Sequence, residues 1–407
     1  MAKIKSSLKA ILNKASELYD NDQFLETSQH LSKSQIKTIK KELKDIASSK
    51  KNGIIGLTKI LKPFILPTSK RVSLVQQFNL SELNLNKNIV VYMPNHKSHL
   101  DEFVIGYTLA GEKLPIPIIA AGENLFKNKI SNFVLKSYGA FKIRRDKYSE
   151  DEHYYRLLSS YLGASFMAGE QFMSFQEGTR PRDGKIGLFR KGIIGTIEKV
   201  FNDLKSNSDC ELEDITFVPI AINWSENPDE KKLTSDANSK AEDTDLLGRF
   251  LNLKKTHSSR DIRGVYLGIG EPVSYKQFVA DNDPDENGSY AIGIVNEVRS
   301  RVVSMMPIYK EHLLHSSIQF LNKHNKHIKI EDLKQLVEVT QKIISNNENN
   351  IKVIETDGFC IDDRLELMLM RDIIKFSDDK LSFEVLDSNM VDYYANHVTS
   401  LTEEREV

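Results

Sequence analysis

The sequence predicts an α/β protein in which helices flank a central mixed sheet, with helical regions at both ends of the chain. Three observations indicate this class. Short β-branched runs alternate with helical stretches through the middle of the chain, and both ends keep a helical apolar period. The 407 residues, 40% of them hydrophobic, can bury a sizeable core. We therefore expect a basic helical region at 1–70, an α/β domain at 71–310 and a mainly helical acidic region at 311–407.

The first region is predicted to be helical and basic. Apolar residues recur at helical spacing over 3–18, with lysines between them, and a second helical pattern covers 34–47. Residues 1–70 hold 14 Lys and Arg against 6 Asp and Glu. A basic amphipathic helix can lie in a membrane interface. Such a helix can also pack on its own protein, and the sequence leaves both possibilities open.

The middle region has the pattern of strands alternating with helices. Buried strands are expected at 89–93, 116–120, 172–175, 216–222 and 265–269. Helices are expected between them, at 103–109, 130–136, 154–168 and 193–203. This alternation predicts a sheet that is covered on both faces. Two polar stretches, 225–264 and 281–289, are expected to be surface excursions.

After Pro307 the chain is predicted to return to helix, and its charge changes sign. Residues 330–344 keep a 3.6-residue apolar period, and a strand-like run follows at 381–386. Residues 311–407 hold 11 Lys and Arg against 19 Asp and Glu, which balances the basic first region to a net charge of −1 for the chain. A basic first region and an acidic last one indicate possible surface attachment; ordinary solvated faces are the alternative.

Composition excludes several classes of protein. Cys210 and Cys360 lie far apart and in no C-x-x-C pair, so neither a disulfide scaffold nor a cysteine-based zinc site is expected. No stretch approaches the roughly 18 apolar residues that cross a membrane, and the N-terminus lacks the apolar segment of a secretion signal. We expect a protein of the cytoplasm.

The strongest chemical signal is Asn95-His-Lys-Ser-His-Leu-Asp101, directly after the strand predicted at 89–93. Proteins of the α/β class build sites at the carboxyl ends of strands, so His96 is expected at such an edge. If the loop reverses into the following helix, Asp101 can bond one ring nitrogen of His96 and leave the other to accept a proton.

Other interpretations of the same segment remain open. Ser98 and Asp101 have the spacing of a capping box, so Asp101 could serve only to start the helix. His99 and Asp101 could form a surface pair. A metal site made of His96, His99 and Asp101 is a further possibility.

A second segment, Gly139-Ala-Phe-Lys-Ile-Arg-Arg-Asp146, is an apolar run that ends in two arginines. Guanidinium groups bind phosphate oxygens in bidentate fashion, so Arg144 and Arg145 are candidate phosphate ligands. The alternative is a solvated pair beside a strand.

A third segment, 175–185, follows the strand predicted at 172–175 and combines glycines with positive charge. Gly178 permits a positive φ and close backbone approach, while Arg180, Arg182 and Lys185 carry the charge. This combination suits a phosphate better than a nucleobase, so no nucleic-acid partner is expected. The segment is not a P-loop, and a simple charged hairpin is the alternative.

These segments resemble, in order, the four motif blocks of the glycerophospholipid acyltransferase superfamily. The matching stretches are 96–101 (H-x4-D), 139–145, 175–180 and Val218-Pro219. Two later stretches, 268–272 and 391–396, are similar to parts of the bacterial membrane-bound type of glycerol-3-phosphate acyltransferase. The third block departs from that type, since it reads Gln176-Glu-Gly-Thr-Arg180 in place of V-E-G-G-R.

The resemblance implies the acyltransferase fold and transfer of a fatty acyl group from acyl-CoA or acyl carrier protein to glycerol 3-phosphate. It also implies peripheral attachment to the cytoplasmic membrane, and neither a metal nor an organic cofactor. His96 would be the general base and Asp101 the residue that orients it. The implied binding residues are Arg144, Arg145, Arg180 and Arg182 for the acceptor phosphate, Glu177 and Gly178 for the glycerol pocket, and Pro219 for the acyl chain.

Two other functions stay open. The acceptor could be 1-acyl-glycerol 3-phosphate, which would need a roomier pocket. A membrane-associated lipid-binding protein could also keep the fold without the chemistry.

Overall fold

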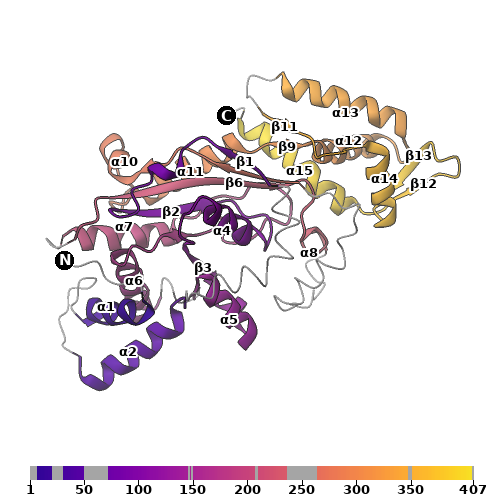
Figure 1. Ribbon diagram of the computed structural model, residues 1–407. Helices are drawn as coiled ribbons and strands as arrows, with labels where there is room; N and C mark the ends of the chain where they lie inside the picture. The colour runs from indigo at the N-terminus through magenta and orange to yellow at the C-terminus, as the bar shows by residue number, and fades with distance from the viewer. Residues whose placement is uncertain are drawn as a thin grey trace.

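The computed structural model describes residues 7–20, 31–49, 72–144, 147, 150–206, 210–235, 264–346 and 351–405. Figure 1 shows three parts in a row: two N-terminal helices at one end, the large sheet with its helices in the middle, and the C-terminal region at the other end. The remainder of the region predicted at 1–70, and residues 236–263 of the predicted excursion, lie outside the described residues.

The large sheet has eight strands and is mixed, as the sequence predicts. Seven of them run in the order β1-β7-β6-β2-β5-β3-β4, and β8 pairs with β6. The β6–β7 and β6–β8 pairs are antiparallel and the other pairs are parallel. The strand bounds are β1 Val72–Gln76, β2 Asn88–Pro94, β3 Ile118–Gly122, β4 Ala140–Ile143, β5 Phe172–Met173, β6 Asp214–Trp224, β7 Val265–Ile269 and β8 Val273–Ser274.

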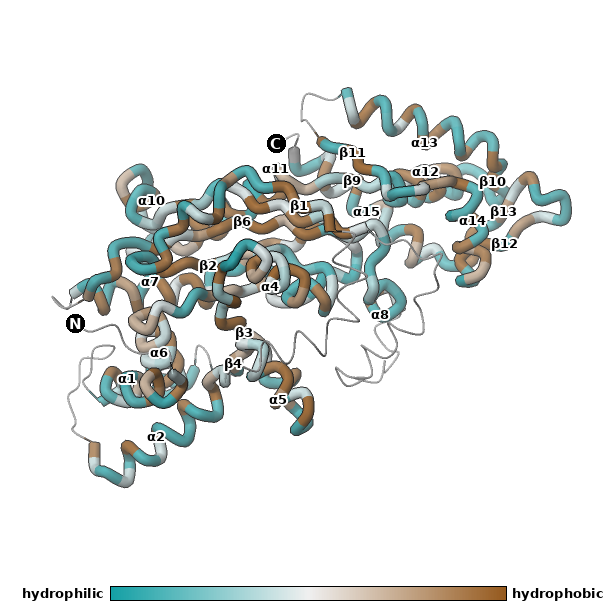
Figure 2. Tube along the Cα trace, in the orientation of Figure 1, coloured by the Kyte–Doolittle hydropathy of each residue, from teal (hydrophilic) through white to brown (hydrophobic). Residues whose placement is uncertain are grey.

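Both faces of the sheet are covered. Alternate residues of β2 enter two different cores, with Ile89 and Val91 in one and Val90 and Tyr92 in the other, as the two-residue period of a strand requires. Helices α6 (Glu152–Met167), α7 (Gly192–Lys205) and α11 (Ala291–Met305) contribute to the first core, and α4 (Asp101–Gly111) contributes to the second. In Figure 2 the hydrophobic residues concentrate along these strands. The remaining elements of this part are η1 Leu80–Glu82, η2 Glu123–Phe126, α5 Lys129–Tyr138, α8 Glu230–Thr234 and α10 Tyr275–Asp281.

The two N-terminal helices, α1 (Leu8–Asp20) and α2 (Lys33–Ile46), bury their apolar faces on the protein itself. Ile11, Ala15 and Leu18 of α1 belong to the first core, and both helices pack against α6. The structure therefore decides between the two possibilities that the sequence left for these apolar faces, in favour of protein packing.

The C-terminal region is mainly helical and has its own core. Its helices are α12 Lys310–His324, α13 Ile330–Ser345, α14 Ile361–Met370 and α15 Ser388–Arg405, with α12 packed on α15. The strand expected at 381–386 is β13 (Ser382–Val385), which lies between β10 (Ile328–Lys329) and β12 (Ile374–Phe376). A second small pair joins β9 (Ile308–Tyr309) to β11 (Val353–Ile354). Among the residues described, none of the helices has the length and apolar character that a membrane crossing needs.

One expectation for the middle region is wrong. Residues 225–235 were expected on the surface because they are polar, but Ser225, Glu226, Asn227 and Glu230 are all buried. Buried polar groups need hydrogen-bond partners, and this segment finds them in the first motif block and in the C-terminal region. The other expected excursion, 281–289, is mostly exposed.

Candidate active site

The loop between β2 and α4 carries the candidate site, and Asn95 fixes its start. The side chain of Asn95 donates to the carbonyl oxygen of Ile222 (3.0 Å) and accepts from the N–H of the same residue (2.8 Å). It thereby extends the β2–β6 pairing by one residue after the strand has ended. The next residue, His96, is held at the carboxyl end of β2, as predicted.

His96 and Asp101 form a pair. The distance from Nδ1 of His96 to Oδ2 of Asp101 is 3.0 Å. The Asp101 side chain is fully buried, and 17% of the His96 side chain is exposed. A proton on Nδ1 that points at Asp101 leaves Nε2 as the nitrogen that can accept another proton.

Three further donors surround the Asp101 carboxylate. Its Oδ2 accepts from the backbone N–H groups of Lys97 (2.6 Å) and Ser98 (2.7 Å), and its Oδ1 accepts from Nε1 of Trp224 (2.9 Å). These bonds compensate for the burial of a charged group. They also fix both oxygens, so that Asp101 can fix the orientation of the His96 ring.

The alternative interpretations of this segment do not account for the position of Asp101, which also bonds His96 and Trp224. Helix α4 has Leu100 at its N-cap with no side-chain capping bond. Of the capping box, only the bond from the Ser98 N–H to Asp101 is formed, because the Ser98 hydroxyl accepts from the N–H of Leu100 (3.2 Å) and not from that of Asp101. His99 pairs with Asp229 and not with Asp101, at 3.0 Å. No group of three His, Cys, Asp or Glu side chains in the described part of the chain could hold a metal ion.

The third motif block supports His96 from the other side. The Phe175 ring lies against the His96 ring, with centroids 4.1 Å apart and planes at 32°. Glu177 is buried and accepts from the backbone N–H of His96 (2.7 Å) with one oxygen and from Gly187 (2.9 Å) with the other. Burial raises the pKa of Glu177, while the Lys97 charge and these two hydrogen bonds oppose the rise. Gly178 has φ +75°, the conformation expected of it.

Arg180 lies beside the same loop and is held by Asp229. Oδ2 of Asp229 contacts Nη1 of Arg180 (2.5 Å) and also accepts from the backbone N–H of His99 (2.8 Å) and the hydroxyl of Ser98 (3.2 Å). Burial opposes ionisation of Asp229, but the hydrogen bond from His99 and the charges of His99 and Arg180 hold its pKa well below the usual range. A carboxylate therefore orients Arg180 next to the loop of the His96–Asp101 pair.

The other predicted arginines are placed differently. Arg144 donates to Glu123 (3.0 Å) and Asp45 (3.4 Å). Arg182 donates to the carbonyl oxygens of Leu233 and Ser235. None of these hydrogen bonds of Arg144 and Arg182 is made to the loop that carries His96. Arg145 lies outside the described residues.

Pro219 is buried in β6, opposite Met93 of β2. Its carbonyl oxygen accepts from the N–H of Gly270 (3.0 Å). The next residue of β6 pairs with Pro94, two residues before His96, so this strand lies beside the start of the site loop.

Sequence reasoning missed Trp224 and Asp229, both of which hold residues of the site. Trp224 ends β6, and the parallel pairing of β6 with β2 brings it to the same sheet edge as the His96 loop. The predicted strand at 216–222 stopped two residues short of it. Asp229 lies in the segment that was expected on the surface, and no sequence signal marked it.

Comparison with known proteins finds one matching family model and several similar proteins. Residues 74–223 match a family model described as Acyltransferase. A glycerol-3-phosphate acyltransferase of Haemophilus influenzae (strain PittEE) is 26% identical over 212 residues, which are 52% of this chain and 25% of the relative. That of Colwellia psychrerythraea (strain 34H) is 28% identical over 215 residues, 51% of this chain and 24% of the relative.

This chain thus spans about a quarter of the length of the curated relatives it matches. Among solved structures, a similar chain is the 1-acyl-sn-glycerophosphate (LPA) acyltransferase PlsC from Thermotoga maritima. The two share 17% identity at a TM-score of 0.30, with 67% of this chain and 85% of that chain covered.

Proposed function

We propose that this chain is a member of the glycerophospholipid acyltransferase family and transfers a fatty acyl group from an acyl thioester to a hydroxyl of glycerol 3-phosphate. The match of residues 74–223 to the Acyltransferase family model and the similarity to glycerol-3-phosphate acyltransferases support this proposal. The donor is acyl-CoA or acyl carrier protein. The observation that carries the proposal is the His96–Asp101 pair, with a buried, fully bonded carboxylate and a partly exposed imidazole.

In the proposed reaction, Nε2 of His96 takes the proton from the acceptor hydroxyl as its oxygen attacks the thioester carbonyl. The resulting tetrahedral intermediate collapses, the new ester bond stays, and the carbon–sulfur bond breaks. The imidazolium returns its proton to the leaving thiolate. Asp101 keeps the ring in the required tautomer and stabilises its positive charge. General-base help of this kind is worth about 10²–10⁴-fold in rate.

We assign the acceptor phosphate first to Arg180, since Asp229 holds its guanidinium beside the loop of His96. Arg145 is a further candidate from the resemblance. Arg144 and Arg182 are candidates that would have to exchange their present hydrogen-bond partners to reach a phosphate. Glu177 and Gly178 would shape the glycerol pocket, and the strand of Pro219 would position the acyl chain.

The test is turnover by the purified protein with labelled acyl-CoA or acyl carrier protein. We expect His96→Ala to lower kcat by at least about 100-fold, while His324→Ala, at an exposed imidazole on α12, keeps the wild-type rate. An unchanged rate in His96→Ala would exclude the general-base role. Turnover with 1-acyl-glycerol 3-phosphate alone would reassign the acceptor, and no turnover with either acceptor would leave the lipid-binding alternative.

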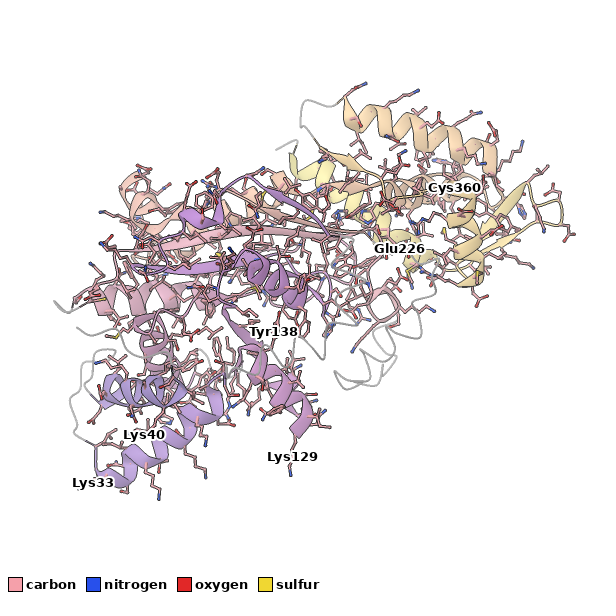
Figure 3. The ribbon with its side chains drawn as sticks, in the orientation of Figure 1. Lys33, Lys40, Lys129, Tyr138, Glu226 and Cys360 are labelled. Atoms are coloured by element: carbon pink, nitrogen blue, oxygen red, sulfur yellow. The ribbon has the colours of Figure 1, made fainter. Side chains whose placement is uncertain are left out.

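We also propose peripheral attachment to an anionic lipid surface, because the product is a lipid. Four exposed lysines follow one another at helical spacing along the outer side of α2: Lys33, Lys37, Lys41 and Lys44. Helix α5 adds two exposed apolar side chains, Ile130 (55% exposed) and Phe133 (68%), beside the exposed Lys129. In Figure 3, Lys33 and Lys129 lie at the same lower margin of the molecule.

Each lysine near an anionic membrane contributes about 1 kcal/mol to binding, and exposed apolar side chains can enter the interface. We expect co-sedimentation with phosphatidylglycerol vesicles to fall in Lys33→Gln/Lys37→Gln/Lys41→Gln and in Phe133→Ser. The matched controls are Lys323→Gln and Phe320→Ser, exposed positions on α12 at the other end of the molecule. Equal binding by the test and control variants would exclude this surface.

A further inference from the structure

Lys97, the residue after His96, is a buried lysine in the middle of the site. It is only 4% exposed, which is rare for lysine. Its Nζ donates to the carbonyl oxygens of Gly184 (2.7 Å) and Lys185 (3.3 Å), both in the third motif segment. Its backbone N–H donates to Asp101. One residue therefore connects the catalytic carboxylate with the loop that follows β5.

The Lys97 ammonium also reaches the C-terminal helix α15. Its Nζ lies 3.4 Å from Nδ1 of His397, and Nε2 of His397 lies 2.9 Å from Nδ2 of Asn223 at the end of β6. Burial and the charge of Lys97 hold the pKa of His397 well below its ordinary value. His397 is therefore neutral at neutral pH, and a neutral ring can lie beside an ammonium group without charge repulsion.

Further contacts bind α15 to the same two loops. The side chain of Asn227 donates to the carbonyl oxygen of Lys97 and to the hydroxyl of Tyr393, both at 2.7 Å. The hydroxyl of Tyr394 accepts from the backbone N–H of Asn227 (2.6 Å). A Cβ atom added at Gly184 would lie 1.7 Å from the carbonyl oxygen of Tyr393. The third motif segment, residues 175–185 and here called the third-block loop, therefore touches the backbone of α15 directly.

The charge of Lys97 is balanced by acids of the site. Burial lowers its pKa, while the negative charges of Glu177, Asp183 and Asp101 oppose that change. Glu177 accepts a hydrogen bond from the backbone N–H of His96, and Asp101 faces the His96 ring. A neutral side chain at position 97 would remove the positive charge that offsets the burial of Glu177, and a buried carboxylate is costly to leave without such a charge.

We propose that Lys97 is a positioning residue, and that α15 is part of the catalytic unit because His397, Tyr393 and Asn227 hold Lys97 and the third-block loop in place. The Lys97 ammonium fixes the loop of His96 and Asp101 against this helix. The inference rests on the proposed acyl transfer, and it extends the site to a helix well beyond residues 74–223 that match the family.

Lys97→Met tests the proposal because it keeps the length of the side chain and removes the ammonium group. A displacement of about 1 Å in a catalytic group can cost roughly 100-fold in rate. We expect kcat to fall at least about tenfold, with KM for glycerol 3-phosphate within about twofold of wild type. Lys323→Met, at an exposed lysine of α12, is the matched control. His397→Phe keeps a ring of similar shape and should lower kcat in the same way.

A double-mutant cycle then separates a shared role from two independent ones. If Lys97 and His397 act as one unit, the double variant should lose little more activity than the more damaging single variant. If the fold-losses in kcat of the two single variants multiply in the double variant, Lys97 and His397 do not act as one unit. Either single variant alone tests the proposal if the other does not fold.

Amide hydrogen exchange in the peptide that covers 96–101 gives a readout that does not need turnover. The N–H groups of Lys97 and Ser98 donate to Asp101, and we expect both variants to speed their exchange while Lys323→Met does not. If wild type turns over and His96→Ala does not, but Lys97→Met and His397→Phe match the control in rate and exchange, the positioning role is wrong and the proposed function stands. If wild type shows no turnover, the proposed function fails, and unchanged exchange would overturn the positioning role as well.

Discussion

The carboxyl groups of Asp101 and Glu102 are adjacent at the start of α4 but differ in the groups that surround them. Asp101 accepts hydrogen bonds from the N–H groups of Lys97, Ser98 and Trp224. It also faces the ring of His96. Burial raises the pKa of Glu102 to about 8, against the hydrogen bond from its own backbone, and the charge of Asp101 adds to the rise. Glu102 is therefore mostly protonated at neutral pH. One residue along the helix decides which carboxyl serves the imidazole.

This difference predicts how stability depends on pH. An acid whose pKa is higher in the folded than in the unfolded protein, where it is about 4.3, costs stability once the pH exceeds the unfolded value, and the cost grows until the folded pKa is passed. An amide has no such cost. We expect Glu102→Gln to melt at a higher temperature than wild type, with a larger difference at pH 9 than at pH 6. Glu112→Gln, at an exposed residue beyond the end of α4, should change it little at either pH; a difference that is the same at both pH values would contradict the prediction.

The pairing that residue spacing alone predicted joins two residues that lie close together in the chain. His96 and Asp101 are five residues apart, and one loop brings them together. Trp224 reaches Asp101 across 123 residues, and Asp229 reaches His99 across 130. Such contacts depend on the register of β6 against β2, which a strand pattern in one sequence does not specify. Polar composition also misplaced Asp229, because burial of a polar segment depends on partners elsewhere in the chain.

At the scale of elements, α15 and the third-block loop meet at a glycine that no other residue can replace without strain. Gly184 and Gly169 both have φ +79°, but only at Gly184 would a Cβ atom meet neighbouring atoms, 1.7 Å from the carbonyl oxygen of Tyr393. Alanine in this conformation costs about 1–2 kcal/mol. We expect Gly169→Ala to lose about that much in free energy of unfolding, measured with urea, and Gly184→Ala to lose at least roughly 2 kcal/mol more, in the range of overpacked sites. Equal losses would mean that α15 is not held against this loop.

The N-terminal helices show what an amphipathic pattern settles and what it does not. The pattern predicted helices at 3–18 and 34–47, and the structure has them at Leu8–Asp20 and Lys33–Ile46. The same pattern suits a lipid surface or a protein core equally well, because both accept apolar side chains. Only the packing of α1 and α2 on α6 shows that their apolar sides are used inside the protein. The exposed lysines of α2 are the ones that we propose for binding to an anionic lipid surface.

At the scale of the whole molecule, buried ion pairs join the C-terminal region to the sheet. Arg364 of α14 contacts Glu226 (3.1 Å), and inside the C-terminal region it also contacts Glu311 of α12 (2.9 Å). Arg371 contacts Glu226 and Glu230, both at 3.0 Å. Glu226 and Glu230 belong to the segment that follows β6 and also carries Asp229. Although residues 311–407 carry an excess of acidic side chains, two of their arginines pair with acidic side chains of the central part.

These pairs predict that the sheet and the C-terminal region unfold together. Arg364→Met would leave Glu226 and Glu311 as buried charges with one partner fewer, and breaking such a pair costs about 3–5 kcal/mol. Lys334→Met removes an exposed pair with Asp362, 38% and 60% exposed, and should cost less than about 1 kcal/mol. Trp224 is the single tryptophan of the chain and bonds Asp101, so its fluorescence reports on the site, while circular dichroism reports on all helices. In urea we expect both signals of Arg364→Met to shift to the same lower midpoint. A Trp224 transition that stays at the wild-type midpoint while the dichroism shifts would show instead that the C-terminal region unfolds by itself.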